Sequence, residues 1–267
     1  MDGRDKHCDV CQGTEFEPYL DGGESGRTLA RCRDCGLVVA MAPAVDAALR
    51  DGSQRDKRTD LRRAAAISKV VPAGRVLEVG CGEGHVLSAL DPARYEVVGV
   101  ETAEPSAASA CRRITEAGLR GSVLPCALAA AGLPAETFDL VAMFGSLARS
   151  VSPRSTLGEV ARLLRPGGYA VIETPGLTSL TALLLGARWR PLHDPRSWYF
   201  FSASSLERLT STCGLSPGST WLPMPVGWPA PGTLVYVARK SAVMHRAGSL
   251  TDLATQVGKI APIGAAH

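Results

Sequence analysis

The chain of 267 residues has no apolar run long enough to cross a membrane and almost no excess of charge of either sign. Its first residues, Met1–His7, are polar and lack the apolar core of a secretory signal peptide, so we expect a cytoplasmic protein without a membrane partner. A formal net charge of +3 does not by itself indicate a nucleic-acid partner. The length suits one full α/β domain with a small appendage, and no feature indicates an oligomeric state.

Four of the eight cysteines form two Cys-x-x-Cys pairs, Cys8 with Cys11 and Cys32 with Cys35. Each pair places two thiolates on one tight turn, and the glycines between the pairs favour a hairpin that returns the chain. Four thiolates suit a closed, structural zinc site, and residues 1–42 have too few apolar side chains to fold without one. Disulfides are the alternative, disfavoured without a secretory signal, and a redox dithiol is disfavoured because the pair occurs twice outside a βαβ unit.

The segment 43–74 reads as a linker followed by a helix with a partial apolar face. Basic side chains occupy the rest of that helix: Arg55, Lys57, Arg58, Arg62, Arg63 and Lys69. A phosphate-binding face is one interpretation, and a solvated helix that covers the sheet or a cofactor is the other. Asp51, Asp56 and Asp60 partly cancel the positive charge, which favours the covering helix.

The stretch Val76–Leu87 organises the rest of the chain. A short apolar run ends at Val79, the glycine-rich turn Gly80–Gly84 follows, and apolar residues at helical spacing then begin near His85. Glycines let the backbone approach a ligand, and a helix N-terminus offers unpaired N–H groups beside it. The pattern indicates a nucleotide-cofactor turn, although a glycine-rich turn alone is a weak signal.

Two acidic residues sharpen this interpretation. Glu78 lies inside the end of the strand, where a carboxylate would suit a cofactor with an ammonium group and would gain nothing from a pyrophosphate. Glu101 closes the next strand-like run, residues 96–101, where an acid accepts hydrogen bonds from ribose hydroxyls.

Helical and strand-like patterns alternate beyond this turn, which predicts a parallel sheet wound with helices on both faces. We expect strands at 75–79, 96–100, 122–124, 137–144, 169–173 and 233–238, and helices at 85–90, 106–117, 155–164 and 202–213. The tail 241–267 has little periodicity.

At these residues the chain resembles the class I S-adenosylmethionine-dependent methyltransferases, whose first motif is acid-x-Gly-x-Gly-x-Gly and is matched by Glu78, Gly80, Gly82 and Gly84. The runs Phe138-Asp-Leu-Val and Arg165-Pro-Gly-Gly, the latter before Tyr169-Ala-Val-Ile-Glu-Thr-Pro, also resemble the family. The resemblance covers roughly residues 70–240 and implies a doubly wound, mostly parallel, seven-stranded Rossmann-like sheet at 75–240, with an aromatic insertion at 176–201. It implies methyl transfer from S-adenosyl-L-methionine.

The resemblance also assigns roles at the cofactor. Glu78 would orient the amino group of the cofactor. The backbone of the glycine turn would lie close to the cofactor's ribose, and Glu101 would hold the ribose hydroxyls. The full set of cofactor candidates is Glu78, Gly80, Cys81, Gly82, Gly84, Glu101, Thr102, Cys126, Ala127, Phe144, Gly145 and Ser146. Many relatives carry an acid that contacts adenine near Cys126, and none is present here, so we expect backbone groups and apolar stacking to hold the adenine.

The acceptor side departs from the family. Relatives with this layout carry Glu-His after strand four and Pro-Glu-His after strand five, but here the segments read Ala148-Arg-Ser-Val and Pro195-Arg-Ser-Trp. Zinc-bearing sugar C-methyltransferases have a similar layout, yet their second Glu-His supplies a base and they carry a further C-terminal domain, so C-methylation by that route is not expected. The candidate catalytic residues are Arg149 and Arg196, to orient an anionic acceptor, and His193 and Tyr199, to assist deprotonation.

Three functions compete. The favoured one is methylation of a small molecule such as a natural product, sugar or related metabolite, because the insertion is rich in Trp, Tyr and Phe and suggests the wall and lid of a pocket. An RNA methyltransferase would use the zinc module and the basic helix, and nucleic acid is the less expected partner. A cofactor-binding partner protein without catalysis is the third. The sequence leaves open whether oxygen, nitrogen or carbon is methylated.

Overall fold

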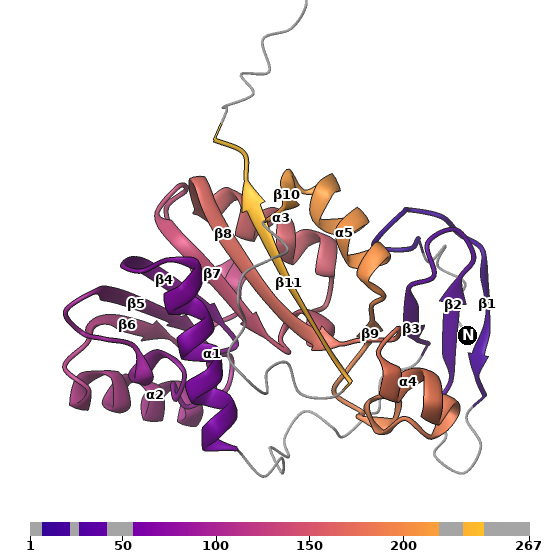
Figure 1. The fold of residues 1–267 in the computed structure, drawn as a ribbon, viewed down its shortest axis with the longest axis horizontal. Coiled ribbons are helices and arrows are strands. Elements are labelled where there is room, and N and C mark those ends of the chain that lie inside the picture. Colours follow the sequence, from indigo (N-terminus) through magenta and orange to yellow (C-terminus); the bar gives the residue numbers. More distant parts are fainter. Residues whose placement is uncertain (1–6, 22–26, 42–55, 219–231, 243–267) are drawn as a thin grey trace, which may run out of the picture.

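The computed structural model describes residues 7–21, 27–41, 56–218 and 232–242, and the elements named below lie in these ranges. A seven-stranded sheet has the order β10-β11-β8-β7-β4-β5-β6 (Figure 1). Its strands are β4 (Gly74–Val79), β5 (Tyr95–Val100), β6 (Arg120–Leu124), β7 (Phe138–Phe144), β8 (Leu164–Pro175), β10 (Leu215–Pro217) and β11 (Thr233–Lys240). The pairs of β11 with β10 and with β8 are antiparallel and the other four described pairs are parallel, which confirms the predicted mostly parallel α/β fold.

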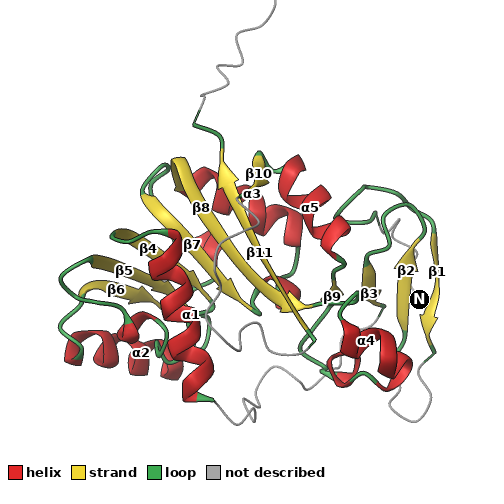
Figure 2. Ribbon diagram, in the orientation of Figure 1, coloured by secondary structure: helices red, strands yellow, loops and turns green. Residues whose placement is uncertain are grey.

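Helices cover both faces of this sheet (Figure 2). Strand β4 shows why both faces are covered. Successive residues of a strand point to opposite faces of the sheet, so neighbouring apolar side chains of β4 enter different cores. Val76 packs in the cluster that contains residues of α1 (Lys57–Val70) and α2 (Glu104–Glu116). Leu77 packs in the cluster that contains residues of α3 (Pro153–Leu163) and α5 (Ala203–Thr212). Burial on both faces explains why the central strand β7 (Phe138–Phe144) is apolar at every position but Asp139.

The predicted helix at 85–90 is wrong: the structure has a single 3-10 turn at Leu87–Ala89. Leu90 already has an extended backbone, with ψ of 154°, because the chain turns through Asp91 to enter β5. Donors for a cofactor on this side must therefore come from the glycine turn itself.

The N-terminal residues form a second sheet of order β1-β2-β3-β9. Its strands are β1 (Phe16–Leu20), β2 (Leu29–Cys32), β3 (Val38–Ala40) and β9 (Tyr199–Phe200). The first two form the expected hairpin. Strand β9 belongs to the segment after β8 and pairs antiparallel with β3, so the cysteine-bearing region and the insertion share one sheet.

The insertion after β8 contains the short helix α4 (Leu180–Leu185) and two 3-10 turns before β9. Its aromatic side chains do not form the expected wall and lid: Trp189, Phe200 and Phe201 are buried in the cores. Pairing of β9 with β3 sends Phe200 into the core beneath α4, while Phe201 enters the core of the large sheet. Trp198 remains partly exposed, and Trp221 and Trp228 lie outside the described residues. None of the described helices has the length and apolar character needed to span a membrane.

Candidate active site

The glycine turn follows β4 at the carboxyl edge of the parallel strands. Gly80, Gly82 and Gly84 have φ of +72°, +54° and +76°, a region that side chains disfavour. A Cβ on Gly80 would lie 2.9 Å from the Cβ of Ser146, and one on Gly84 would lie 2.8 Å from that of Ala110. Both the backbone conformation and the lack of space therefore require glycine here.

The carboxylate of Glu101 holds this turn against the end of β5. One oxygen accepts a hydrogen bond from the backbone N–H of Gly82, at 2.9 Å, and the other accepts one from Ala103, also at 2.9 Å. The Thr102 hydroxyl lies 3.5 Å from the same carboxylate. Glu101 is only partly buried, and each carboxylate oxygen has further lone pairs that ribose hydroxyls can use.

A buried cluster that sequence reasoning missed surrounds Glu78. Arg63 of α1 donates two hydrogen bonds to Glu173 of β8, with Nε 3.0 Å from Oε2, and its guanidinium lies over the Phe144 ring at 5.2 Å. Burial opposes the positive charge on Arg63, but the bonds to Glu173 and the nearby charges of Glu173, Asp60 and Glu78 raise its pKa. Two acids at the ends of buried parallel strands, Glu78 and Glu173, were the available signal, because buried carboxylates require a cation.

The remaining cofactor candidates lie around the same edge. Gly145, at φ +84°, donates its N–H to the Glu173 carbonyl at 2.8 Å. The Ser146 hydroxyl is buried against Gly80 and has no hydrogen-bond partner among the described residues, so a ligand in the turn would supply one. Cys126 and Ala127 follow β6, with Cys126 partly buried and Ala127 exposed, whereas the Cys81 side chain fills the space above Gly99. A glycine cradle with an unsatisfied hydroxyl fits a cofactor.

The two candidate arginines of the acceptor side are brought together by Asp194, which sequence reasoning also missed. Arg196 Nε lies 3.0 Å from one carboxylate oxygen of Asp194, and an Arg149 nitrogen lies 3.9 Å from the other. Burial raises the pKa of Asp194, but the hydrogen bonds from Arg196 and the charges of Arg196 and Arg149 outweigh it and lower the pKa overall. The available signal was the Asp-x-Arg spacing of Asp194 and Arg196.

The two candidate bases bind different backbone carbonyls. The Tyr199 hydroxyl donates to the carbonyl of Val151 at 3.0 Å, and burial together with the charge of Asp9 raises the pKa of Tyr199 to about 12. His193 is exposed, and its Nε2 lies 2.7 Å from the Ala187 carbonyl within the insertion.

The four N-terminal cysteines converge as a compact cluster. All four Sγ atoms lie within 4.8 Å of one another, with Cys8 and Cys35 at 3.4 Å and Cys11 and Cys32 at 3.5 Å. These separations exceed the length of a sulfur–sulfur bond, about 2.05 Å, and suit four thiolates around one ion. The hydrogen bond from Cys35 and neighbouring backbone N–H groups overcome burial and lower the pKa of Cys8 to about 5.

The cysteine cluster is anchored to the large domain. Arg154 of α3 donates to the carbonyls of Asp9 and Val10, at 2.8 and 2.7 Å, and the Ser152 hydroxyl donates to the Asp9 carboxylate at 3.2 Å. The loop between Cys8 and Cys11 is thereby bound to the start of the helix that follows β7.

Comparison with known proteins agrees with this geometry. A family model described as a methyltransferase domain matches residues 26–217. The chain belongs to this methyltransferase family. The structure is similar to that of a SAM-dependent methyltransferase from Thermotoga maritima, with a TM-score of 0.52, 22% identity and coverage of 68% of this chain and 89% of the other. The strand order and the glycine turn agree with this family membership.

The relatives of this methyltransferase differ in their acceptors. A tRNA U34 carboxymethyltransferase of Methylococcus capsulatus is 30% identical over 188 residues, which cover 64% of this chain and 56% of the relative. An aklanonic acid methyltransferase of a Streptomyces species is 30% identical over 151 residues, which cover 51% of this chain and 67% of the relative. The chain spans about half the length of the first curated relatives that it matches.

Proposed function

We propose that this methyltransferase acts on a small-molecule acceptor, a natural product, sugar or related metabolite. The observation that carries this choice is the position of Arg63, which is directed inward to Glu173 and Asp60 and is not available to a phosphate backbone. The small net charge of +3 and the relative that methylates aklanonic acid support the same choice.

The residues at the sheet edge would orient the cofactor. S-adenosylmethionine, when bound, supplies an electrophilic methyl group with its leaving group already attached. Glu78 would face the amino group, Glu101 would accept from the ribose hydroxyls, and Ser146 would donate to a polar atom of the cofactor. Alignment and exclusion of water then account for most of what the protein must do.

Arg149 and Arg196 would orient the acceptor from the neighbouring loop. Trp198 donates its backbone N–H to the carbonyl of Ala148 at 2.7 Å, so the loop that carries Arg196 is held against the segment that follows β7. Asp194 lies between the two guanidinium groups and links them, and Arg27 donates to the backbone carbonyls of Asp194 and Ser197 beside them. An anionic or strongly polar acceptor suits a loop with this many guanidinium groups, with His193 or Tyr199 assisting any deprotonation.

The cysteine cluster would hold one structural zinc ion. Cys8, Cys11, Cys32 and Cys35 supply all four positions of a tetrahedral site and leave none for a substrate. In this proposal residues 1–42 form the zinc module, 43–74 the linker and covering helix, 75–240 the methyltransferase domain and 241–267 the tail.

Two other functions remain in competition. The tRNA U34 carboxymethyltransferase relative favours an RNA acceptor. The missing Glu-His pairs favour a partner protein that binds the cofactor without catalysis.

A transfer assay with labelled S-adenosylmethionine distinguishes the three candidate functions. The purified protein is incubated with the labelled cofactor and with either the metabolite fraction or the RNA fraction of an extract of its native cells. We expect label in the metabolite fraction, with Glu78→Ala as the inactive control. Label in RNA would overturn the small-molecule assignment, and cofactor binding without transfer to either fraction would indicate the partner protein.

A further inference from the structure

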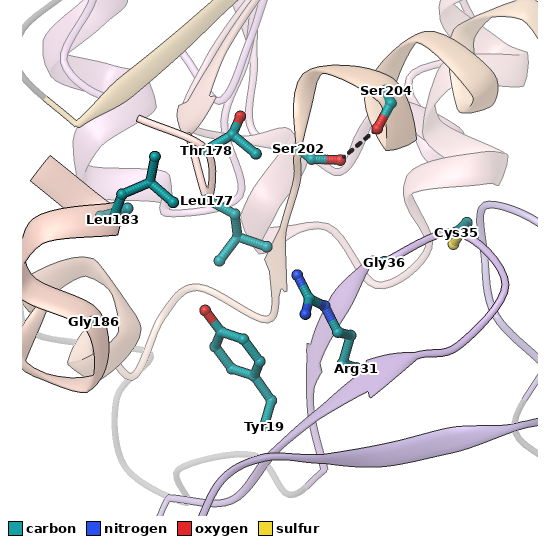
Figure 3. Close-up of a pocket in the computed structure, with 11 residues that line it drawn as sticks. Tyr19, Arg31, Cys35, Gly36, Leu177, Thr178, Leu183, Gly186, Ser202 and Ser204 are labelled. Atoms are coloured by element: carbon teal, nitrogen blue, oxygen red, sulfur yellow. Dashed lines mark hydrogen bonds between the residues drawn. The ribbon is translucent and has the colours of Figure 1, made fainter. Parts of the chain in front are cut away.

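A cavity of about 440 Å³ lies between the sheet of the cysteine region and the segment after β8, and none of the cofactor candidates lines it. Figure 3 shows side chains entering it from β1, β2, α4 and the start of α5. Its size is that of a small-molecule site. Its lining includes Tyr19, Arg31, Leu177, Leu183, Ser202 and Ser204.

Arg31 supplies the cavity with a positive charge. Its guanidinium lies over the Tyr19 ring, 5.5 Å from the centroid. Across the described ranges no carboxylate forms an ion pair with Arg31, whereas the nearby Arg33 lies 3.9 Å from Glu15 and 3.6 Å from Glu17. A guanidinium stacked on a ring presents its N–H groups edgewise, in the geometry that binds a carboxylate or phosphate.

The start of α5 adds further donors on another side. Ser202 caps the helix by accepting the N–H of Ser205 at 3.1 Å, and its hydroxyl lies 3.0 Å from that of Ser204 (Figure 3). Ser204 is exposed, so its hydroxyl can rotate to donate to a ligand. The partial positive charge at the N-terminus of this ten-residue helix acts in the same direction.

Two leucines supply most of the apolar lining, beside Thr178 and the candidate zinc ligand Cys35. Leu177 is buried in the core beneath α4, but Leu183 on α4 is 68% exposed although it borders the cavity. A large apolar side chain that stays exposed beside a cavity gains free energy when a ligand covers it.

We propose that this cavity binds a small molecule that carries a carboxylate or phosphate on an apolar body. Arg31, with the Ser204 hydroxyl, binds the anionic group, and Leu177 and Leu183 pack against the apolar body. This inference is independent of the acceptor class proposed above, because none of these residues belongs to the cofactor or catalytic candidates. Two sources supply such chemistry: the far end of the methyl acceptor, or a separate metabolite.

Phenyl phosphate is the probe, because it joins an anion to an apolar ring. Its binding to the full chain is measured by ligand-observed NMR, beside benzyl alcohol and inorganic phosphate. We expect phenyl phosphate to bind most tightly, and Arg31→Gln to weaken it about tenfold or more. The matched control Arg33→Gln removes an equal charge nearby and should leave the affinity unchanged.

A second variant keeps the proposal testable if Arg31→Gln disturbs the hairpin. Leu183→Asp changes an exposed side chain, should fold normally, and should weaken phenyl phosphate by placing a negative charge beside the anion. The proposal is wrong if the wild type does not bind phenyl phosphate, or if both variants bind it as the wild type does.

The labelling assay then separates the two sources. Loss of labelled product in Arg31→Gln, with cofactor affinity retained, assigns the cavity to the acceptor. Unchanged labelling together with weakened phenyl phosphate assigns it to a separate metabolite. The assay can fail for want of an acceptor without affecting the binding measurement, so failure of the proposed function and of this site are distinguishable.

Discussion

The proposed cofactor edge and the proposed acceptor side of this chain are built in different ways. At the cofactor edge the glycine turn and Glu101 lie close in the chain and contact each other directly, through the Gly82 N–H. At the proposed acceptor side Arg149 and Arg196 are 47 positions apart in the sequence and are linked through Asp194. The difference teaches that the contact between the glycine turn and Glu101 depends on local backbone geometry, whereas the arginine pair depends on how the insertion after β8 packs against the segment after β7.

The strongest way to separate the two regions is to remove the proposed zinc site. Cys32→Ser takes away a buried candidate ligand, and because zinc binding in such modules supplies on the order of 10 kcal/mol of folding free energy, we expect the four-stranded sheet to be lost. Elemental analysis should fall from about one zinc per chain to none, and near-ultraviolet circular dichroism should change. S-adenosylmethionine binding should be retained, since the cofactor edge lies on the other sheet.

Cys111→Ser is the matched control, because Cys111 is exposed on α2 and belongs to no cluster. A wild-type protein that contains no metal after purification under reducing conditions would contradict the prediction.

Arg63 tests whether the cofactor edge also depends on distant pairing. Arg63→Met leaves Glu173 buried without its cation, so we expect a loss of about 2–3 kcal/mol in the free energy of unfolding, below the value for a fully buried pair because Arg63 is partly exposed. Urea denaturation measures it. The double variant Arg63→Met with Glu173→Leu should recover most of the loss, and Arg62→Met should change little. An unchanged midpoint in Arg63→Met would show that the pair does not contribute to stability.

The same contrast explains what could be predicted from the sequence. The strands and the long helices were predicted because hydrophobic periodicity is local, and β4 to β8 lie near their expected positions. The prediction of a helix at 85–90 was wrong because hydrophobic periodicity does not show how soon the chain must turn at Asp91 to enter β5. The aromatic insertion was misread because the pairing of β9 with β3 joins residues more than a hundred positions apart, and no local pattern reports it.

Among the candidate site residues, those in a local motif could be predicted from the sequence and those defined by contacts between distant elements could not. The acids and glycines of the cofactor motif could be read from their spacing, but Arg63 and Asp194 could not, because each is defined by partners on other elements. A buried carboxylate requires a nearby cation, but the sequence around it does not identify the residue that supplies the cation.

Glu101 sharpens the comparison on the cofactor side. Glu101→Ala removes both the acceptor for ribose hydroxyls and the bond to Gly82, so we expect S-adenosylmethionine to bind about 1.5–3 kcal/mol more weakly. Calorimetric titration measures it. Glu96→Ala removes an acid from β5, the strand that ends just before Glu101. The Glu96 carboxylate lies 3.1 Å from partly buried Arg75 and not at the glycine turn, so this variant should bind the cofactor normally. Equal affinity in Glu101→Ala and the wild type would remove Glu101 from the site.

The smallest effect is expected at Tyr199, and it decides whether the acceptor side contains a tyrosine base. A base must be deprotonated, and with its pKa raised to about 12 only about one Tyr199 in 10⁵ is ionised at pH 7. Its hydroxyl already donates to the Val151 carbonyl, so Tyr199→Phe should cost about 1 kcal/mol of stability and change the labelled product by less than about threefold. Between pH 6 and 9 the rates of the variant and the wild type should run parallel, because Tyr199 does not titrate in that window. A rate that rises tenfold per pH unit in the wild type and is flat in Tyr199→Phe would make Tyr199 the base, and would mean that acceptor binding breaks the bond to Val151 and lowers the pKa. His193→Gln in the same assay separates the two candidate bases, since a loss of labelled product in that variant and not in Tyr199→Phe would assign the deprotonation to His193.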